Sequence, residues 1–299
     1  MRIGLFFDPP RSIDQFLAQL IDAERRGFAS AWVAQIFSWD ALTLLAIAGR
    51  EVPRMELGTS VVPTYPRHPS VLAGQALTTQ VASGGRLVLG IGLSHQIVVE
   101  GMWGYSYDRP ARHMREYLDA LLPLLRGESV AVEGETLKAM GNITIPDPPS
   151  PPPVLLAALA PRMLHLAGAV ADGTVTWMTG VKTVESHIVP AITAAATSAG
   201  RAAPRVAVGL PVCVTDDPAG AREQAAKTFA VYGHLPSYRA MLDKEGAAGP
   251  ADVAIAGDEA TVTAEVRRLA DAGATDFAGA VFGSAEERAR TLDVLAGLV

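Results

Sequence analysis

The sequence has a single cysteine, Cys213, among its 299 residues. One thiol can form no intramolecular disulfide, and it supplies too few sulfur ligands for a cysteine-based zinc or iron–sulfur site. Disulfide-poor chains are typical of reducing compartments, so we expect a cytoplasmic protein.

Basic charge and long apolar runs are scarce as well. Lys and Arg number 25 against 31 Asp and Glu, which gives a net charge of −6. Because nucleic-acid binding needs a basic footprint, we expect no nucleic-acid partner. No apolar run approaches the roughly 18 residues of a membrane span, and the first residues, MRIGLFFDPP, lack the apolar core of a secretory signal peptide. We therefore expect no membrane association and a small-molecule partner.

Hydrophobic residues, by contrast, make up 49% of the chain, which is enough for a large core. Short apolar runs alternate with segments of helical periodicity along the whole length. Eight runs are predicted to be strands: residues 3–7, 31–33, 57–62, 87–91, 154–158, 174–177, 206–214 and 276–282. Their nearly continuous apolar character is typical of parallel strands that are buried on both faces.

Eight strand–helix units in about 300 residues predict an α/β fold, a (β/α)8 TIM barrel that occupies residues 1–299 as one domain. A doubly wound sheet usually has a glycine-rich turn after its first strand, and here that turn reads Asp8-Pro9-Pro10. We expect insertions after strands four and seven, at residues 92–109 and 234–258. Residues 128–145 read as a hairpin, and the proline-rich residues 146–153 read as an extended connector to strand five.

The loops that follow the strands are where a barrel of this kind holds its active site. The fourth such loop reads GIGLSH, in which Gly92 lets the backbone approach a ligand closely and Ser94 and His95 stand at the strand end. His95 is a candidate proton donor or a hydrogen-bond partner for a bound ring. A structural histidine that anchors the long loop is the alternative.

The fifth strand leads into a turn of small residues, Ala158-Leu159-Ala160, directly before a predicted helix. Backbone N–H groups at a helix N-terminus suit a phosphate, and Arg162 adds positive charge there. A compact turn without a ligand is an equally common interpretation.

Several standard catalytic motifs are missing. The sequence has no Gly-x-Ser-x-Gly elbow, no phosphate-binding Gly-x-x-x-x-Gly-Lys-Ser/Thr loop and no His-Glu-x-x-His pair. Its six histidines show no ligand-like spacing, so we expect no metal site.

Four segments together resemble the luciferase-like monooxygenase superfamily, and in particular its actinobacterial branch that uses the deazaflavin coenzyme F420. They read GTSVVPTYPRHP, SGGRLVLGIGLSH, EGMWGYSYDRPARHMREYLDALLPLL and GLPVCVTDDP. The resemblance covers nearly the whole chain from Gly4 onward. It is specific over Glu56–Leu125 and generic elsewhere.

The resemblance implies a luciferase-like barrel with a flavin or deazaflavin at its mouth, in a protein that is commonly a homodimer. It implies a non-proline cis peptide bond behind the ring, at Ser60–Val61 in this chain. The residues that it assigns to the cofactor are Gln35, Ser60, Val61, Thr64, Gly92, Leu93, Ser94, His95, Ala158, Leu159 and Ala160.

The chain departs from relatives that oxidise sugar phosphates or alcohols. Those relatives carry an Asp-His pair after strand two, where this chain has Gln35-Ile36, and a glutamate after strand four, where it has His95. Gln35 can hydrogen-bond but is no useful acid at neutral pH. We therefore expect an F420-dependent oxidoreductase that moves a hydride between the deazaflavin C5 and a small organic substrate, with His95 as the proton donor.

Two other functions remain open from the sequence. One is an FMN-dependent monooxygenase on the same barrel, and the other is a non-catalytic cofactor-binding protein, since the dehydrogenase acid and base are missing. For F420, with its phosphate and polyglutamate tail, the acidic chain must supply a local basic groove. We expect that groove at Arg67, Arg109, Arg112 and Arg162.

Overall fold

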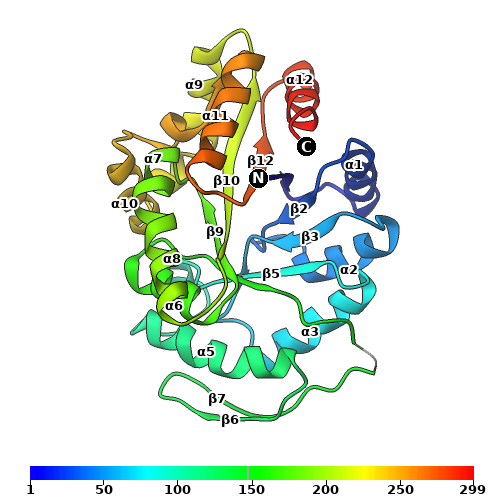
Figure 1. Cartoon of the computed structure of the whole chain (residues 1–299), viewed down its shortest axis with the longest axis vertical. Coiled ribbons are helices and arrows are strands. Elements are labelled where there is room, and N and C mark those ends of the chain that lie inside the picture. Colours follow the sequence, from blue (N-terminus) through cyan, green and yellow to red (C-terminus); the bar gives the residue numbers. More distant parts are fainter. Residues whose placement is uncertain (147) are drawn as a thin grey trace.

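Parallel strands that alternate with helices close into a barrel in the computed structural model, which describes residues 1–146 and 148–299. Within this part of the chain the barrel has eight strands, each paired in parallel with its neighbours. In sequence order they are β1 (Arg2–Phe7), β2 (Ser30–Val33), β3 (Glu56–Thr59), β5 (Leu87–Gly92), β8 (Val154–Leu156), β9 (Gly173–Trp177), β10 (Arg205–Val214) and β12 (Asp276–Val281). Pairing of β12 with β1 completes the circle and confirms the predicted TIM barrel (Figure 1).

Helices surround the strands, as Figure 1 shows. They are α1 (Ile13–Arg25), α2 (Ala41–Glu51), α3 (Pro69–Ala82), α5 (Pro110–Leu125), α6 (Pro161–Val170), α8 (Val189–Ser198), α9 (Pro218–Thr228), α11 (Glu259–Asp271) and α12 (Ala285–Ala296). No helix in residues 1–146 and 148–299 combines the length and the apolar character that a membrane crossing requires.

Helix starts follow directly from the sequence. Ser12 caps α1 by accepting a hydrogen bond from the backbone N–H of Gln15 at 3.1 Å, and Asp40 caps α2 in the same way. Ser284 and Glu287 form a capping box at the start of α12. Such caps satisfy N–H groups that the first helical turn leaves without partners.

Both predicted insertions are present. The connection after β5 contains α4 (Gln96–Gly101), and the connection after β10 contains α9, α10 (Pro236–Glu245) and β11 (Ile255–Gly257), which pairs with β10. The predicted hairpin is β6 (Val130–Glu133) with β7 (Lys138–Gly141), which lies below α5 in Figure 1. In the predicted proline-rich connector, Asp147 lies outside the described residues, and its neighbours form no helix or strand.

Two predicted strand boundaries were wrong. The third strand does not run unbroken through residues 57–62, because it stops at Thr59 and resumes as β4 (Val62–Pro63) after Ser60–Val61. The fifth strand stops at Leu156 rather than Ala158. Between β9 and β10 the helical segment is divided into α7 (Val181–Thr183), a π-helical turn at 184–188 and α8.

The barrel interior is filled by side chains that point inward from alternate strand positions: Trp32, Val88, Leu155, Val175, Ala207 and Ala278. Trp32 is fully buried and lies against Gly58, where a Cβ would come within 2.3 Å of the indole ring. A glycine at position 58 therefore makes room for the largest interior side chain.

The end of the barrel where the strands begin is closed by an ion network around the buried Asp276. Arg205 donates to both oxygens of Asp276, at 2.8 and 2.7 Å, and also pairs with Glu56. Arg2 bonds the same two carboxylates. Burial alone would raise the pKa of Asp276, but the hydrogen bonds and charge of Arg205 outweigh burial and hold that pKa below its usual value.

Candidate active site

A large cavity lies at the opposite end of the barrel, where the strands finish. It is a cavity of about 1,080 Å³ lined by the ends of β5 and β9, by the turn between β8 and α6, and by the α4 and α10 insertions. Strand ends from distant parts of the sequence therefore meet at one opening, as the barrel geometry predicts.

Ser60 and Val61 form one wall of this mouth cavity. The peptide bond between them is cis, which confirms the sequence prediction. Gly92 faces the same wall, because a Cβ there would lie 2.7 Å from Val61 Cγ2 and 3.1 Å from Ala157 Cβ. The absence of a side chain at position 92 lets the end of β5 pack against Val61.

His95 lies on the mouth cavity together with Leu93 and Ser94. Ser94 has a positive φ of 60°, and its carbonyl oxygen accepts a hydrogen bond from the Tyr107 hydroxyl at 3.2 Å. This bond ties the loop after β5 to the start of α5. Burial lowers the pKa of His95, so its imidazole is neutral at neutral pH.

The turn before α6 brings backbone N–H groups to the same cavity. Leu159 and Ala160 line it, and α6 begins at Pro161 without a side-chain cap. The N–H groups of Leu159 and Ala160 have no hydrogen-bond partner among the described residues. This is the arrangement that binds an anion at a helix N-terminus.

Three of the sequence-predicted residues are not on the cavity surface. Gln35 uses its side-chain oxygen to accept the backbone N–H of Ala41 at 2.7 Å, at the start of α2. Thr64 is buried behind the mouth, with its hydroxyl 3.2 Å from His113 Nε2. Ala158 is fully buried, and its N–H lies 3.4 Å from the Thr174 hydroxyl. Ser60, Val61, Gly92, Leu93, Ser94, His95, Leu159 and Ala160 do line the cavity.

An aromatic wall crosses the mouth, and two of its members, Tyr232 and Tyr238, were not predicted from the sequence. Trp177 at the end of β9 stacks on Phe6, with ring centroids 5.0 Å apart, and meets Tyr232 edge-on at 5.9 Å. Tyr232 meets Tyr238 of α10 at 5.1 Å, and Tyr238 lies 5.6 Å from the His95 ring. Tyr238 belongs to an insertion whose sequence has no strand–helix periodicity. The spaced aromatic residues Phe229, Tyr232 and Tyr238 were the only sequence signal for a wall of the site in this region.

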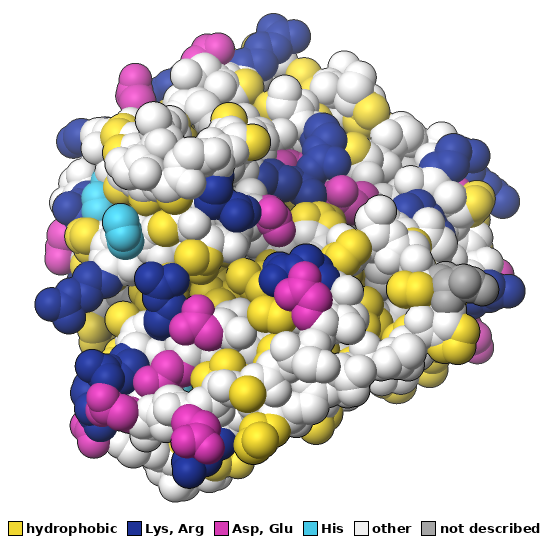
Figure 2. All heavy atoms as spheres, turned by 60° about the horizontal axis from the view of Figure 1, so that its bottom comes forward, with side chains coloured by type: hydrophobic (Ala, Val, Ile, Leu, Met, Phe, Trp, Pro, Cys, Tyr) yellow, Lys and Arg dark blue, Asp and Glu magenta, His cyan; other side chains and the backbone are white. Residues whose placement is uncertain are grey.

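Only part of the predicted basic groove lies at the mouth. Arg109, Arg112 and Arg162 line the cavity, but the first two are paired with Glu135 at the tip of the hairpin. Arg67 instead pairs with Asp40, away from the cavity. Figure 2, which turns the lower end of Figure 1 forward, shows acidic and basic side chains interspersed over that face rather than gathered by sign.

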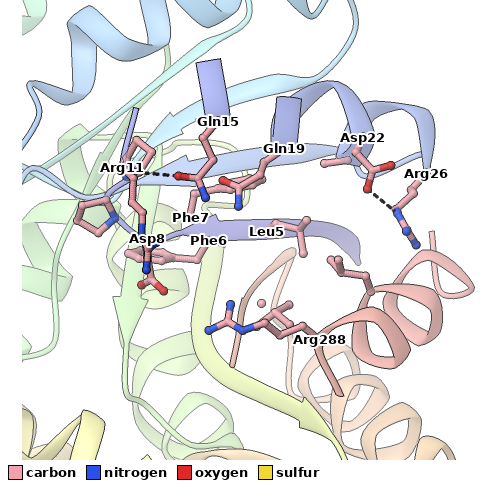
Figure 3. Close-up of a pocket in the computed structure, with 16 residues that line it drawn as sticks. Leu5, Phe6, Phe7, Asp8, Arg11, Gln15, Gln19, Asp22, Arg26 and Arg288 are labelled. Atoms are coloured by element: carbon pink, nitrogen blue, oxygen red, sulfur yellow. Dashed lines mark hydrogen bonds and ion pairs between the residues drawn. The ribbon is translucent and has the colours of Figure 1, made fainter. Parts of the chain in front are cut away.

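A second cavity of about 510 Å³ lies outside the barrel, between α1 and α12. In Figure 3, Gln15 and Gln19 extend from α1 toward β1, and Arg288 extends from α12 on the other side. Burial raises the pKa of Asp8 at this cavity, and the charge of Arg288 partly offsets the rise. Unlike the mouth cavity, this hollow lies on the outer face of the strands.

Among residues 1–146 and 148–299, no group of three or more His, Cys, Asp or Glu side chains is arranged to hold a metal ion.

Comparison with known proteins gives the family context. Residues 1–298 match the family model described as luciferase-like monooxygenase. The 5,10-methylenetetrahydromethanopterin reductase of Methanolobus tindarius is 28% identical over 232 residues, which cover 77% of this chain and 70% of the relative.

Solved structures share the fold. The coenzyme F420-dependent tetrahydromethanopterin reductase from Methanopyrus kandleri superposes with a TM-score of 0.80 at 22% identity, over 99% of this chain and 97% of that one. The oxygenating constituent of 3,6-diketocamphane monooxygenase from Pseudomonas putida, solved with FMN, superposes with a TM-score of 0.76 at 18% identity, over 99% and 97%.

Proposed function

Because the chain belongs to the luciferase-like monooxygenase family, we propose that it is a coenzyme F420-dependent oxidoreductase that moves a hydride between the deazaflavin C5 and a small organic substrate. The observation that carries the proposal is that one cavity gathers Ser60–Val61, Gly92–His95 and Leu159–Ala160. These are the segments assigned to ring and phosphate from the sequence. The F420-dependent reductase of the same fold supports this choice of cofactor.

The described residues fit such a cofactor. Val61 and Gly92 provide a close-packed wall for a flat ring, and the free N–H groups before α6 suit its phosphate. Gln35, Thr64 and Ala158 belong to this proposal as residues that hold the contacting segments in place. When bound, F420 supplies the hydride chemistry, while the protein orients its face and excludes water.

His95 is the proposed proton donor. Its ring borders the mouth cavity, and its lowered pKa makes it a neutral imidazole at neutral pH. A neutral imidazole still donates one ring N–H to a substrate or cofactor oxygen. His95→Ala should keep cofactor affinity and slow turnover, and unchanged turnover would remove His95 from the mechanism.

An FMN-dependent monooxygenase is the second candidate function, because a structural neighbour of this fold holds FMN. Titrating the protein with F420 and with FMN, and following each absorbance spectrum, separates the two. Affinity for FMN alone would overturn the leading proposal. Tight F420 binding without turnover on a panel of enones, imines and alcohols would favour the third possibility, a non-catalytic cofactor-binding protein.

Three further expectations belong to the same proposal. Residues 1–299 form one domain, the protein is a cytoplasmic homodimer, and its partner in catalysis is a small organic molecule. Sedimentation equilibrium of the purified protein tests the dimer, and limited proteolysis tests the single domain.

A further inference from the structure

The α10 insertion places a phenol at the inner side of the mouth. Tyr238 lines the cavity, and its ring is fixed by Tyr232 on one side, edge-on at 5.1 Å, and by His95 on the other, at 5.6 Å. The position of the Tyr238 hydroxyl is therefore set by packing on two sides, and it stands beside the proposed proton donor.

The Tyr238 hydroxyl can donate a hydrogen bond to a ligand. In the described part of the chain, no hydrogen-bond partner contacts the Tyr238 Oη. Burial raises the pKa of Tyr238, and the neighbouring Tyr232 adds to the rise, so the phenol keeps its proton at neutral pH. A ligand oxygen at this position would give the Tyr238 hydroxyl a hydrogen-bond acceptor.

Much of the surrounding wall is aromatic or aliphatic. Trp177 lines the same cavity and is held between Phe6, stacked at 5.0 Å, and Tyr232, edge-on at 5.9 Å. Val61 and Val175 also line the cavity, and Thr176 adds one hydroxyl beside Trp177. Flat aromatic and conjugated molecules pack well against such faces.

The strand ends contribute no charged side chain to the lining of the mouth cavity. The charged residues that line the mouth cavity, Glu100, Arg109, Arg112 and Arg162, come from α4, α5 and α6 and their flanking turns, and none comes from a strand end. His95 is neutral. An ionised group on the substrate would therefore meet no counter-charge at the inner wall.

We propose that the mouth cavity selects an uncharged, flat substrate, an aromatic or conjugated carbonyl compound, whose oxygen accepts a hydrogen bond from the Tyr238 hydroxyl. This inference rests on the proposed function, since the compound is the substrate of that site. The hydrogen bond draws electron density toward the oxygen and makes the carbonyl carbon a better acceptor. Tyr238 is thereby a specificity-determining residue beside His95.

Binding measurements with matched probes test the proposal without relying on turnover. Acetophenone is flat and uncharged with a carbonyl oxygen. In α-methylstyrene a CH2 group replaces that oxygen, 4-acetylbenzoate adds a charge, and cyclohexyl methyl ketone is not flat. Saturation-transfer NMR titrations give the Kd of each for the protein alone, with F420 and with FMN.

We expect acetophenone to bind about 10-fold more tightly than α-methylstyrene, the effect of one additional neutral hydrogen bond. Tyr238→Phe should weaken acetophenone binding by about 10-fold and leave α-methylstyrene within 2-fold. The control Tyr105→Phe, at a hydroxyl outside the cavity lining, should change neither Kd.

Other outcomes overturn the proposal. If Tyr238→Phe weakens the binding of acetophenone and α-methylstyrene equally, Tyr238 has only a packing role. If neither Kd changes, the carbonyl oxygen of acetophenone does not contact the Tyr238 hydroxyl. Tighter binding of 4-acetylbenzoate than of acetophenone would overturn the uncharged substrate class, and equal binding of cyclohexyl methyl ketone would overturn the flat one. If neither cofactor binds, the proposed function fails, while the probe ratios measured on the protein alone still decide this inference.

Discussion

The two ends of the barrel satisfy their polar groups in opposite ways. At the end where the strands begin, Arg205 is bonded to Asp276 and Glu56, and the guanidinium also lies 5.6 Å over the Trp32 ring. At the mouth, Tyr238 and the N–H groups before α6 lack partners among the described residues. The first end satisfies its polar groups within the chain, whereas the second leaves polar groups open to a ligand. Fold stability and ligand recognition are therefore expected to separate along the barrel axis.

Breaking the closed end should have the largest effect on stability. Arg205→Ala would leave the buried Asp276 carboxylate without its main partner, and such losses cost about 3–5 kcal/mol of unfolding free energy. Urea unfolding measures this loss. Arg268→Ala, at an exposed pair with Glu265, is the control and should cost under about 1 kcal/mol.

The same variant tests the separation itself. Under conditions where the Arg205→Ala protein remains folded, its affinity for the bound cofactor should stay within about 2-fold of the wild type. A large loss of cofactor affinity in the folded variant would show that the two ends are coupled and would contradict the separation of stability from ligand recognition.

The two ends of the barrel should lose their contributions to stability in different pH ranges. His113, behind the mouth, has its pKa lowered by burial to about 4, with Glu116 partly opposing the shift. In the unfolded chain His113 takes up a proton below about pH 6.5, whereas in the folded chain it stays neutral down to about pH 4. Between these two pH values the unfolded state binds more protons, so the free energy of unfolding falls as the pH falls. At about 1.4 kcal/mol per pH unit over this window, the loss attributable to His113 approaches about 3.5 kcal/mol.

Asp276 gives the contrasting range. Its lowered pKa means that its contribution is present above its usual value near 3.8 and is lost only as the pH falls further. His113→Gln should therefore flatten the stability profile between pH 6.5 and 4 and leave the profile below pH 4 unchanged, as followed by urea unfolding at each pH. A profile that is unchanged in the upper window would contradict the burial of a neutral His113.

Filling the mouth at Gly92 should weaken both cofactor binding and the fold. Gly92→Ala would place a methyl group 2.7 Å from Val61 Cγ2, which must then move from the wall assigned to the ring. We expect a loss of about 1–2 kcal/mol in unfolding free energy and at least a 10-fold loss in cofactor affinity. Gly74→Ala in α3 is the matched control, since nothing lies within 4 Å of its added Cβ, and it should leave affinity unchanged and stabilise the helix slightly.

How far the sequence predicted this molecule also differs between the two ends. Periodicity located every barrel strand, because each is an apolar run of defined length, and the barrel rule then directed attention to Gly92–His95 and Leu159–Ala160. The ion network escaped prediction because Arg2, Glu56, Arg205 and Asp276 are far apart in sequence and meet only when the barrel closes.

The mouth was predicted only in part, for a related reason. Gln35 and Thr64 stand at the correct strand ends, but hydrogen bonds to Ala41 and His113 hold them off the cavity surface. Tyr238 arrives from an insertion whose path depends on packing against Tyr232 and not on any local pattern. The direction of a side chain and the path of an insertion depend on tertiary packing. The rule that a barrel's active site lies at the strand ends predicts neither of them.

The smallest predicted effect concerns the one mouth arginine without an ion-pair partner among the described residues. Arg162 stands in the first turn of α6 beside the free N–H groups. Because it is exposed to water, its contribution to phosphate binding is screened, and Arg162→Gln should weaken FMN or F420 binding by only about 3- to 10-fold. Riboflavin, which lacks the phosphate, should bind both proteins equally in the same fluorescence titration. The difference in FMN affinity between the wild type and Arg162→Gln should shrink as the salt concentration is raised. An equal loss of affinity for riboflavin and FMN in Arg162→Gln would show instead that Arg162 does not act on the phosphate.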